Sequence, residues 1–345
     1  MSPLTDALRQ ATMSLAAPGL AICLVLGSCS SHAVDELAPP LSELSILEIA
    51  CPGADEGISF SGVFRHGRRI FLLPESKHRP ERVRLIDCSE ENPKLETYLV
   101  LPKELVPNGF DGFEAAVAFG DELFVTIEAK TPQATRGYVA KALLNPHTSK
   151  LEVHKVVEVP LRSRQFNRSV EALTIFKNRL YAFEEINSAP ANLLPVAHEY
   201  DRELNYLRAL PLPQIPYRVT DATETDAQGR FWVINYWWPG DVDLKQSSDS
   251  IALPWGIGRS HSEPNNRAGQ QVERLLELRI EEDRVSLVPR APRYLELETK
   301  ARNWEAIARL SDDRFLVATD THPRTIVAEV HGPFSDARFP GGNEP

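Results

Sequence analysis

Short apolar runs arranged in pairs recur along the chain and give the first indication of its organisation. Each pair opens with a polar or acidic residue followed by a small one, and the second run begins nine or ten residues after that polar residue. The turn between the two runs is rich in Gly, Asp, Asn or Arg. Such runs, separated by turn residues, predict β-hairpins. Five hairpins are expected, at 60–73, 113–125, 170–183, 220–233 and 304–317.

The spacing of these hairpins predicts a repeat fold. Their equivalent polar positions lie 53, 57, 50 and 84 residues apart. The first three intervals match the roughly 40 to 50 residues of a four-stranded propeller blade with some loop added. A polar stretch at about 240–270 explains the long interval as an inserted loop. Further strand-like runs between the hairpins predict third and fourth strands, at 82–86, 138–144, 151–159, 272–280 and 285–288.

The two ends of this repeat complement each other. Only one strand-like run, 325–330, follows the last hairpin, and an apolar run at 44–50 has no partner of its own. Pairing the early run into the last blade would close the ring and cover its free edges. We therefore predict an all-β protein, a single β-propeller over 44–335 with five four-stranded blades closed by an N-terminal strand. A six-bladed ring, with a blade inside the 84-residue interval, is the alternative. Residues 336–345 are expected to form a flexible tail.

Composition narrows the class of protein. With 42% hydrophobic and 25% charged residues, the chain of 345 residues has an ordinary globular composition. Its 27 prolines lie mostly between the short apolar runs, which argues against a helical bundle. The formal net charge of -10 excludes sequence-independent binding of nucleic acid, because that requires a basic surface.

The first residues predict export. The apolar run at 15–26 is shorter than the about 20 residues needed to span a bilayer, so it fits a cleaved signal. Leu26-Gly27-Ser28-Cys29 resembles the bacterial lipobox, in which the Cys receives a lipid. We expect a signal peptide at 1–28 and a lipidated tether at 29–43, which would anchor the protein in the bacterial cell envelope. Ser30 after the lipidated Cys implies the outer membrane, facing the periplasm. An apolar N-terminal helix is the alternative.

Two cysteines remain once Cys23 leaves with the signal and Cys29 carries the lipid. An exported compartment permits disulfides, so Cys51 and Cys88 form a candidate bridge. It would fasten the ring closure to the first blade. Two separate buried thiols are the alternative, because the sequence does not supply the distance between the two Cα atoms.

Equivalent positions of the innermost strands meet around the axis of a propeller. Four carboxylates converging there would repel one another unless a cation neutralises them. Oxygen ligands without Cys or His favour a hard ion, and Ca²⁺ tolerates irregular coordination better than Mg²⁺. The alternative is that these acids are solvated or accept hydrogen bonds from backbone N–H groups. The predicted calcium ligands are Ser61, Glu114, Glu171, Asp221 and Glu305.

This order of residues, each opening a blade, resembles the phytase-like propeller family, for which an esterase-like activity is proposed. It is also similar to the soluble calcium-activated nucleotidases, five-bladed propellers with an axial Ca²⁺. The resemblance covers most of 57–330 and rests on motifs of two or three residues. The chain departs from the pattern with Ala115, Ala172 and Ala306 where a Gly commonly follows the Glu, and with Asp221 where Ser is common.

The loops around the mouth of the channel carry the candidate chemistry. First strands begin, and second strands end, on the same face. Arginines beside a metal suit a phosphate or carboxylate ligand, and an aromatic ring can stack on a substrate ring or sugar. The predicted general bases are Glu185, Asp320 and His322. The predicted substrate-binding residues are Arg162, Arg164, Arg168, Arg218, Arg302 and Tyr236. Alternatively, these charges pair with one another across the loops.

Two functions are therefore kept open. In the first, the protein is a calcium-dependent hydrolase of phosphoesters or other esters, with an anionic small molecule or an ester as substrate. In the second, the ion only braces the channel, and the upper face binds a partner protein or another envelope component. Propellers serve both purposes, so the fold does not choose between them.

Overall fold

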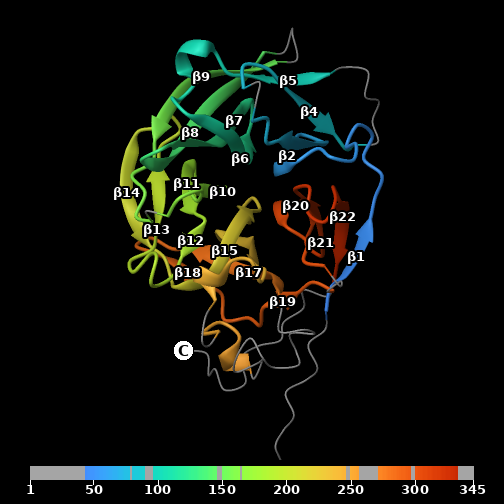
Figure 1. Cartoon of the computed structure of the whole chain (residues 1–345), viewed down its shortest axis with the longest axis vertical. Helices are drawn as coiled ribbons and strands as arrows, with labels where there is room; N and C mark the ends of the chain where they lie inside the picture. The colour runs from blue at the N-terminus through green and yellow to red at the C-terminus, as the bar shows by residue number, and fades with distance from the viewer. Residues whose placement is uncertain are drawn as a thin grey trace, which may run out of the picture. The chain divides into compact units, whose positions relative to one another are not determined.

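The computed structural model describes residues 43–77, 80–89, 96–145, 150–163, 165–245, 249–255, 271–296 and 300–332. This part of the chain forms five blades of four antiparallel strands each. Figure 1 shows the innermost strands β2, β6, β10, β15 and β20 facing a common centre. The predicted propeller with five blades is confirmed. The described residues of the 84-residue interval complete blade 4 and contain no sixth blade.

Each blade is named by its order along the chain, with its innermost strand first. Blade 1 contains β2 (Phe60–His66), β3 (Arg69–Pro74), β4 (Val83–Asp87) and β5 (Thr97–Val100). Blade 2 contains β6 (Phe110–Phe119), β7 (Glu122–Thr131), β8 (Ala134–Asn145) and β9 (Lys150–Glu158). Blade 3 contains β10 (Val170–Phe176), β11 (Arg179–Glu184), β13 (Val196–Tyr200) and β14 (Tyr206–Pro211).

Blades 4 and 5 follow the same plan. Blade 4 contains β15 (Ile215–Ala222), β16 (Arg230–Trp237), β17 (Val272–Ile280) and β18 (Val285–Leu287). Blade 5 contains β20 (Trp304–Ser311), β21 (Arg314–Thr319), β22 (Val327–His331) and β1 (Ser45–Glu48). Two short strands, β12 (Ile186–Asn187) and β19 (Arg293–Tyr294), pair with β15 and β17. The helical turns are η1 (Lys103–Leu105), η2 (Val242–Leu244) and η3 (Leu253–Trp255).

The ring closes as predicted, through strands from the two ends of the described chain. Strand β1 pairs antiparallel with β22, so that Ile46 lies opposite Val330. A disulfide joins Cys51, which follows β1, to Cys88 at the end of β4, with their Cα atoms 4.8 Å apart. The predicted bridge is therefore confirmed, and it ties the closing strand of blade 5 to blade 1.

Hydrophobic cores lie between neighbouring blades. Successive side chains of a strand point to opposite faces of its sheet, so each blade contributes to two cores. In β16, Phe231 and Val233 pack toward blade 3, whereas Trp232 packs toward blade 5. Because both faces of every blade are covered, the strands contain near-continuous apolar runs instead of a simple alternation of apolar and polar residues.

The small residue that follows each axial position has a packing reason. Inner strands of adjacent blades approach closely there, and a Cβ added at Gly62 would lie 3.1 Å from the backbone nitrogen of Ala116. Ala115, Ala172 and Ala306 are fully buried at the equivalent positions. Alanine therefore satisfies most of the steric requirement that glycine satisfies in blade 1.

Blades 1 and 2 are joined along their outer edge as well. Strand β5 pairs in parallel with β9, with Leu99 opposite Leu151, so the two blades form one eight-stranded sheet. No helix among the described residues is long and apolar enough to cross a membrane. The predicted signal peptide, most of the tether, the predicted tail and residues 246–248 and 256–270 of the inserted loop lie outside the described residues.

Candidate functional site

All five blades share an irregularity at the predicted axial position. The register between the first and second strand shifts by one residue at Ser61, Glu114, Glu171, Asp221 and Glu305 or next to them. A bulge of this kind bends the strand and redirects a side chain. The sequence comparison located these equivalent positions, but it did not predict the bulges.

A second set of mostly acidic residues lies on the second strands or just after them, each paired with the residue two before an axial position. These positions are Glu75, Glu128, Glu185, Asn235 and Asp320, so acids occupy both sets except at Ser61 and Asn235. Glu114 lies near this second set, because a Cβ added at Gly112 would fall 3.2 Å from its carboxylate and 2.8 Å from the side chain of Glu75. The channel mouth is therefore lined by two layers of carboxylates.

Burial raises the pKa of all four axial carboxyl groups, Asp221 included. The pKa of Glu114 lies well above its ordinary value because of burial and then the neighbouring charges of Glu128 and Glu75. The pKa of Glu171 is raised well above its ordinary value by burial and by the charge of Glu114. Burial raises the pKa of Glu305 to about 8, although Arg218 acts in the opposite direction. At neutral pH these carboxyl groups favour a proton or a bound cation.

Several oxygens of this cluster fit the chemistry of a hard cation. Within the described residues, Glu114 and Glu171 make no hydrogen bond or ion pair, and one carboxylate oxygen each of Glu128 and Glu185 is buried without a partner. However, no three Asp, Glu, His or Cys side chains of the described chain converge closely enough to hold an ion as they stand. A cation would therefore have to draw these side chains together.

Asp221 is placed differently from the prediction. It is fully buried, and its two carboxylate oxygens accept hydrogen bonds from the backbone N–H groups of Ala222 and Ile307, both at 2.8 Å. Ile307 belongs to β20, so the aspartate ties blade 4 to blade 5. A shorter side chain than Glu at this bulge reaches the neighbouring backbone, and its oxygens are already engaged.

Arg302 also differs from its predicted role in binding substrate. It is buried, and its backbone N–H and side-chain Nε both donate to Glu273 at 3.0 Å. The guanidinium lies 5.0 Å from the ring of Trp304. Arg302 therefore stabilises the junction of blades 4 and 5 and does not line the pocket described next.

A pocket of about 840 Å³ opens between the loops of blades 3, 4 and 5. Six predicted site residues line it together: Glu185, Asp320, His322, Arg168, Arg218 and Tyr236. Arg162 does not line this pocket. Its side chain is exposed, and its backbone N–H donates to Glu184 at 2.7 Å. Arg164 lies outside the described residues.

Arg218 links the three blades at the base of the pocket. It forms an ion pair with Glu185 of blade 3 and another with Glu305 of blade 5, the latter at 3.3 Å. It also donates to Asn303 at 3.2 Å, and its guanidinium lies 5.7 Å from the ring of Tyr236. These two buried acids hold the pKa of Arg218 well above its ordinary value, even though burial lowers it. The guanidinium of Arg218 therefore keeps its positive charge, and the carboxylates of Glu185 and Glu305 offset that charge.

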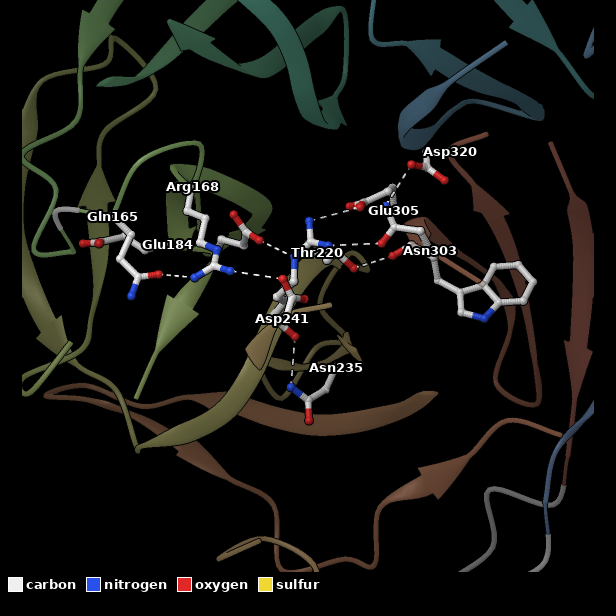
Figure 2. A network of polar contacts seen from close by, with 12 residues as sticks. Gln165, Arg168, Glu184, Thr220, Asn235, Asp241, Asn303, Glu305 and Asp320 are labelled. Carbon is white, nitrogen blue, oxygen red and sulfur yellow. Dashed lines mark hydrogen bonds and ion pairs between the residues drawn. The ribbon is translucent and has the colours of Figure 1, made fainter. Parts of the chain in front are cut away.

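Arg168 joins blade 3 to the inserted loop of blade 4. It donates to Asp243 at 2.5 Å. It also donates to Asp241 at 3.1 Å (Figure 2). Asp241 and Asp243 were not predicted as site residues. Arginine lies three residues before the axial position in blades 3, 4 and 5, a regularity that could have identified these cross-blade partners.

Asp320 presents a fixed carboxylate to the pocket. It accepts hydrogen bonds from the side chain of Asn303 at 2.9 Å and from the backbone N–H of His322 at 2.6 Å. The ring of His322 lies 3.3 Å from the same aspartate, and its side chain is 79% exposed. Figure 2 shows Asn303, Glu305 and Asp320 close together on blade 5. The aspartate and histidine can exchange a proton, with the histidine in contact with solvent.

A buried arginine that sequence reasoning missed anchors the inserted loop. Arg274 of β17 donates to Asp249 of that loop at 2.5 Å and to Asn235 at 2.7 Å. Asn235 in turn donates to the backbone oxygen of Arg218 at 3.0 Å. This network connects the position of the loop to the position of the central arginine.

Comparison with known proteins gives only structural likenesses. No protein-family model matches the chain, and no curated protein matches it. Among solved structures, a thermostable family-43 glycoside hydrolase is 13% identical, with a TM-score of 0.47, covering 86% of this chain and all of the other. A putative glycoside hydrolase from Parabacteroides distasonis is 8% identical (TM-score 0.47; 86% and 95% covered). A glucose dehydrogenase is 12% identical (TM-score 0.45; 82% and 100% covered). Likenesses this distant carry no argument about activity.

Proposed function

We propose that this protein is a hydrolase of phosphoesters or other esters, and that its active site is the pocket between blades 3, 4 and 5. The observation that carries this proposal is the meeting of Asp320 and Glu185 on one pocket, with Arg218 in contact with Glu185. Acid–base hydrolysis needs a fixed carboxylate, a group that carries protons and a cationic group, and Asp320, His322 and Arg218 supply these in the pocket.

The residues have separate roles in this proposal. Asp320 takes a proton from a water molecule whose oxygen then bonds to the acyl carbon or phosphorus. His322 receives that proton from Asp320 and delivers it to the leaving oxygen as its bond breaks. Arg218 lies beside the reacting group and stabilises the negative charge that develops on it, while Glu185 and Glu305 hold the guanidinium in place.

A calcium ion in the channel remains part of the proposal, with a smaller ligand set than the sequence predicted. Glu114, Glu171 and Glu305 would hold it, with Glu128 beside them, whereas the carboxylate of Asp221 is engaged elsewhere. Such an ion would supply a Lewis acid that polarises the ester. We further propose that a lipid on Cys29 anchors the protein in the bacterial envelope, at the outer membrane facing the periplasm.

The test is hydrolysis of a phosphoester and carboxylic-ester panel by the purified chain, before and after chelation. Asp320→Asn should reduce turnover at least about 100-fold, because loss of a general base typically removes that much. Asp312→Asn is the matched control, since Asp312 is an exposed aspartate paired only loosely with Arg309 at 3.8 Å. Activity lost on chelation and restored by Ca²⁺ would support the ion.

The same experiment addresses the second candidate, a non-catalytic binding scaffold. Large apolar side chains are exposed in loops of blades 3 and 4, with Leu194 at 75% and Val242 at 74%, as in surfaces that bind a partner protein. Absence of turnover across the panel, with Asp320→Asn indistinguishable from the native chain, would favour the scaffold.

A further inference from the structure

The charges around the pocket balance. Its walls carry three permanent cations and three carboxylates, namely Arg168, Arg218 and Lys300 against Glu185, Asp241 and Asp320. Both arginines are already paired, Arg168 with Asp241 at 3.1 Å and Arg218 with Glu185. An anion entering the pocket would therefore add charge to walls that are already balanced, although Arg218 keeps N–H groups that can donate to an oxygen that becomes negative during the reaction.

Acceptor oxygens are in excess at the same walls. Beneath the wall, one carboxylate oxygen of Glu185 and one of Asp241 are buried without any hydrogen-bond donor among the described residues, so their negative charge is not fully offset there. A phosphate or carboxylate placed beside them would add repulsion and bring no donor, because it has acceptors only. A ligand rich in hydroxyl groups brings donors as well as acceptors. The side-chain amides of Asn167, Gln271 and Asn303 line the pocket too and can serve both roles.

An aromatic face stands open at the edge of the pocket. The side chain of Trp238 is 45% exposed and lines the pocket together with Tyr236 and Phe166. Its ring lies against the backbone of Gly240, where an added Cβ would fall 2.2 Å from the ring atoms. Only glycine leaves room for the indole in this position. The six-membered ring of the indole therefore packs against its own loop, and the exposed part of Trp238 is available for stacking.

We propose that the pocket binds a neutral, hydroxyl-rich ring, a sugar unit, which stacks on Trp238 and bonds through its hydroxyl groups to the carboxylates and amides of the wall. This inference deepens the proposed function and rests on it for the reaction alone: the bond hydrolysed would be an ester on the sugar. Binding itself does not require turnover.

The experiment measures binding to the purified chain by saturation-transfer NMR and tryptophan fluorescence. The probes are neutral mono- and disaccharides of hexoses and pentoses, and inorganic phosphate. We expect at least one neutral sugar to bind with a Kd in the millimolar range or tighter, and more tightly than phosphate. Because the ligand carries no charge, its Kd should change less than about twofold between low and high salt.

Variants locate the site. Trp238→Ala should weaken sugar binding about tenfold, the loss of roughly one good contact. Trp238→Phe, which keeps an aromatic face, should retain most of the affinity. Phe119→Ala is the control, because Phe119 is an exposed aromatic at the end of β6, at the other end of its hairpin. Tighter binding of phosphate, no binding of any sugar, or unchanged binding by Trp238→Ala would each overturn the inference.

The two proposals fail separately. Sugar binding without hydrolysis of any ester would uphold the inference and count against the hydrolase. Hydrolysis of a simple ester, with no sugar bound in the pocket, would uphold the hydrolase and overturn the sugar site.

Discussion

Blades 1 and 2 resemble blades 3 to 5 in backbone and differ in how their inner acids are neutralised. In blades 1 and 2, a lysine two residues after the second-strand acid pairs with it locally, Lys77 with Glu75 at 2.8 Å and Lys130 with Glu128 at 2.9 Å. In blades 3 to 5, Arg218 reaches across to acids of both neighbouring blades. A local ion pair lies within one blade and does not link it to its neighbours. Arg218, in contrast, links blades 3, 4 and 5 around the pocket.

The joints between the blades differ in the same way. Blades 1 and 2 share an eight-stranded sheet through β5 and β9, and blades 5 and 1 share a disulfide. Blades 4 and 5 are held by side chains such as Asp221, which accepts from Ile307 of the next blade. A shared sheet and a covalent bond thus hold the joints of blade 1, whereas polar side chains contribute to the joints around the pocket.

Replacing Arg218 should have the largest effect on this arrangement. Arg218→Met leaves Glu185 and Glu305 buried without their cation, which should lower the free energy of unfolding by roughly 3–5 kcal/mol. The matched change in the other region is Lys77→Met, which should cost only about 0–1 kcal/mol, because Lys77 and its partner Glu75 both keep contact with water. Urea unfolding at pH 7 measures both. Equal losses would contradict the distinction between the two regions.

Opening the disulfide should have the next largest effect. The Cys51→Ser, Cys88→Ser variant removes a link between residues 37 apart in sequence, which should lower the free energy of unfolding by about 3–4 kcal/mol. Hydrogen exchange should quicken in β1 and β22, while β5 and β9 keep their protection through the shared sheet. Uniform loss of protection in all five blades would show that the two joints are not independent.

Over the single pH unit from 7 to 8, the change in stability with pH should be the smallest of the three effects. The pKa of Glu305 is about 8 in the folded protein, well above that of an unfolded glutamate, so the folded state holds a proton that the unfolded state releases. Stability is then fully present below about pH 4.5 and falls as the pH rises toward 8, by at most about 1.4 kcal/mol per pH unit for this group.

Thermal unfolding across this pH range provides the measurement. Glu305→Gln should flatten the decline, and Asp312→Asn should leave it unchanged, because Asp312 is exposed. If Ca²⁺ binds the axial acids, adding it at pH 8 should restore the stability lost. A decline that survives Glu305→Gln undiminished would assign the proton to another group.

Most of the fold could be predicted because the responsible signals are local and repeated. The paired apolar runs, the turn residues and the unpartnered run at 44–50 define the blade repeat and its closure without any knowledge of contacts. Cys51 and Cys88 could be placed at the closure for the same reason. The register of a strand pair follows from such patterns, since a one-residue slip would move every side chain to the other face.

The site was predictable only in part. Glu185, Asp320, His322, Arg168, Arg218 and Tyr236 were expected at the mouth of the channel and do line one pocket. Asp221 and Arg302 look equivalent to their neighbours in sequence, yet they turn to Ile307 and Glu273 instead. Nothing near either residue in the sequence distinguishes them from those that face the pocket.

The blade repeat, the strand that closes the ring, the cysteines available for a bridge and the positions that surround the axis could be predicted from the sequence alone, whereas the structure was needed to choose five blades over six. Only the tertiary structure decided which acids remain without partners, which arginines are neutralised and where the pocket opens. The reason is physical: strand pattern depends on neighbours in sequence, whereas the partner of a buried charge depends on bulges and on blades that meet only after the ring has closed.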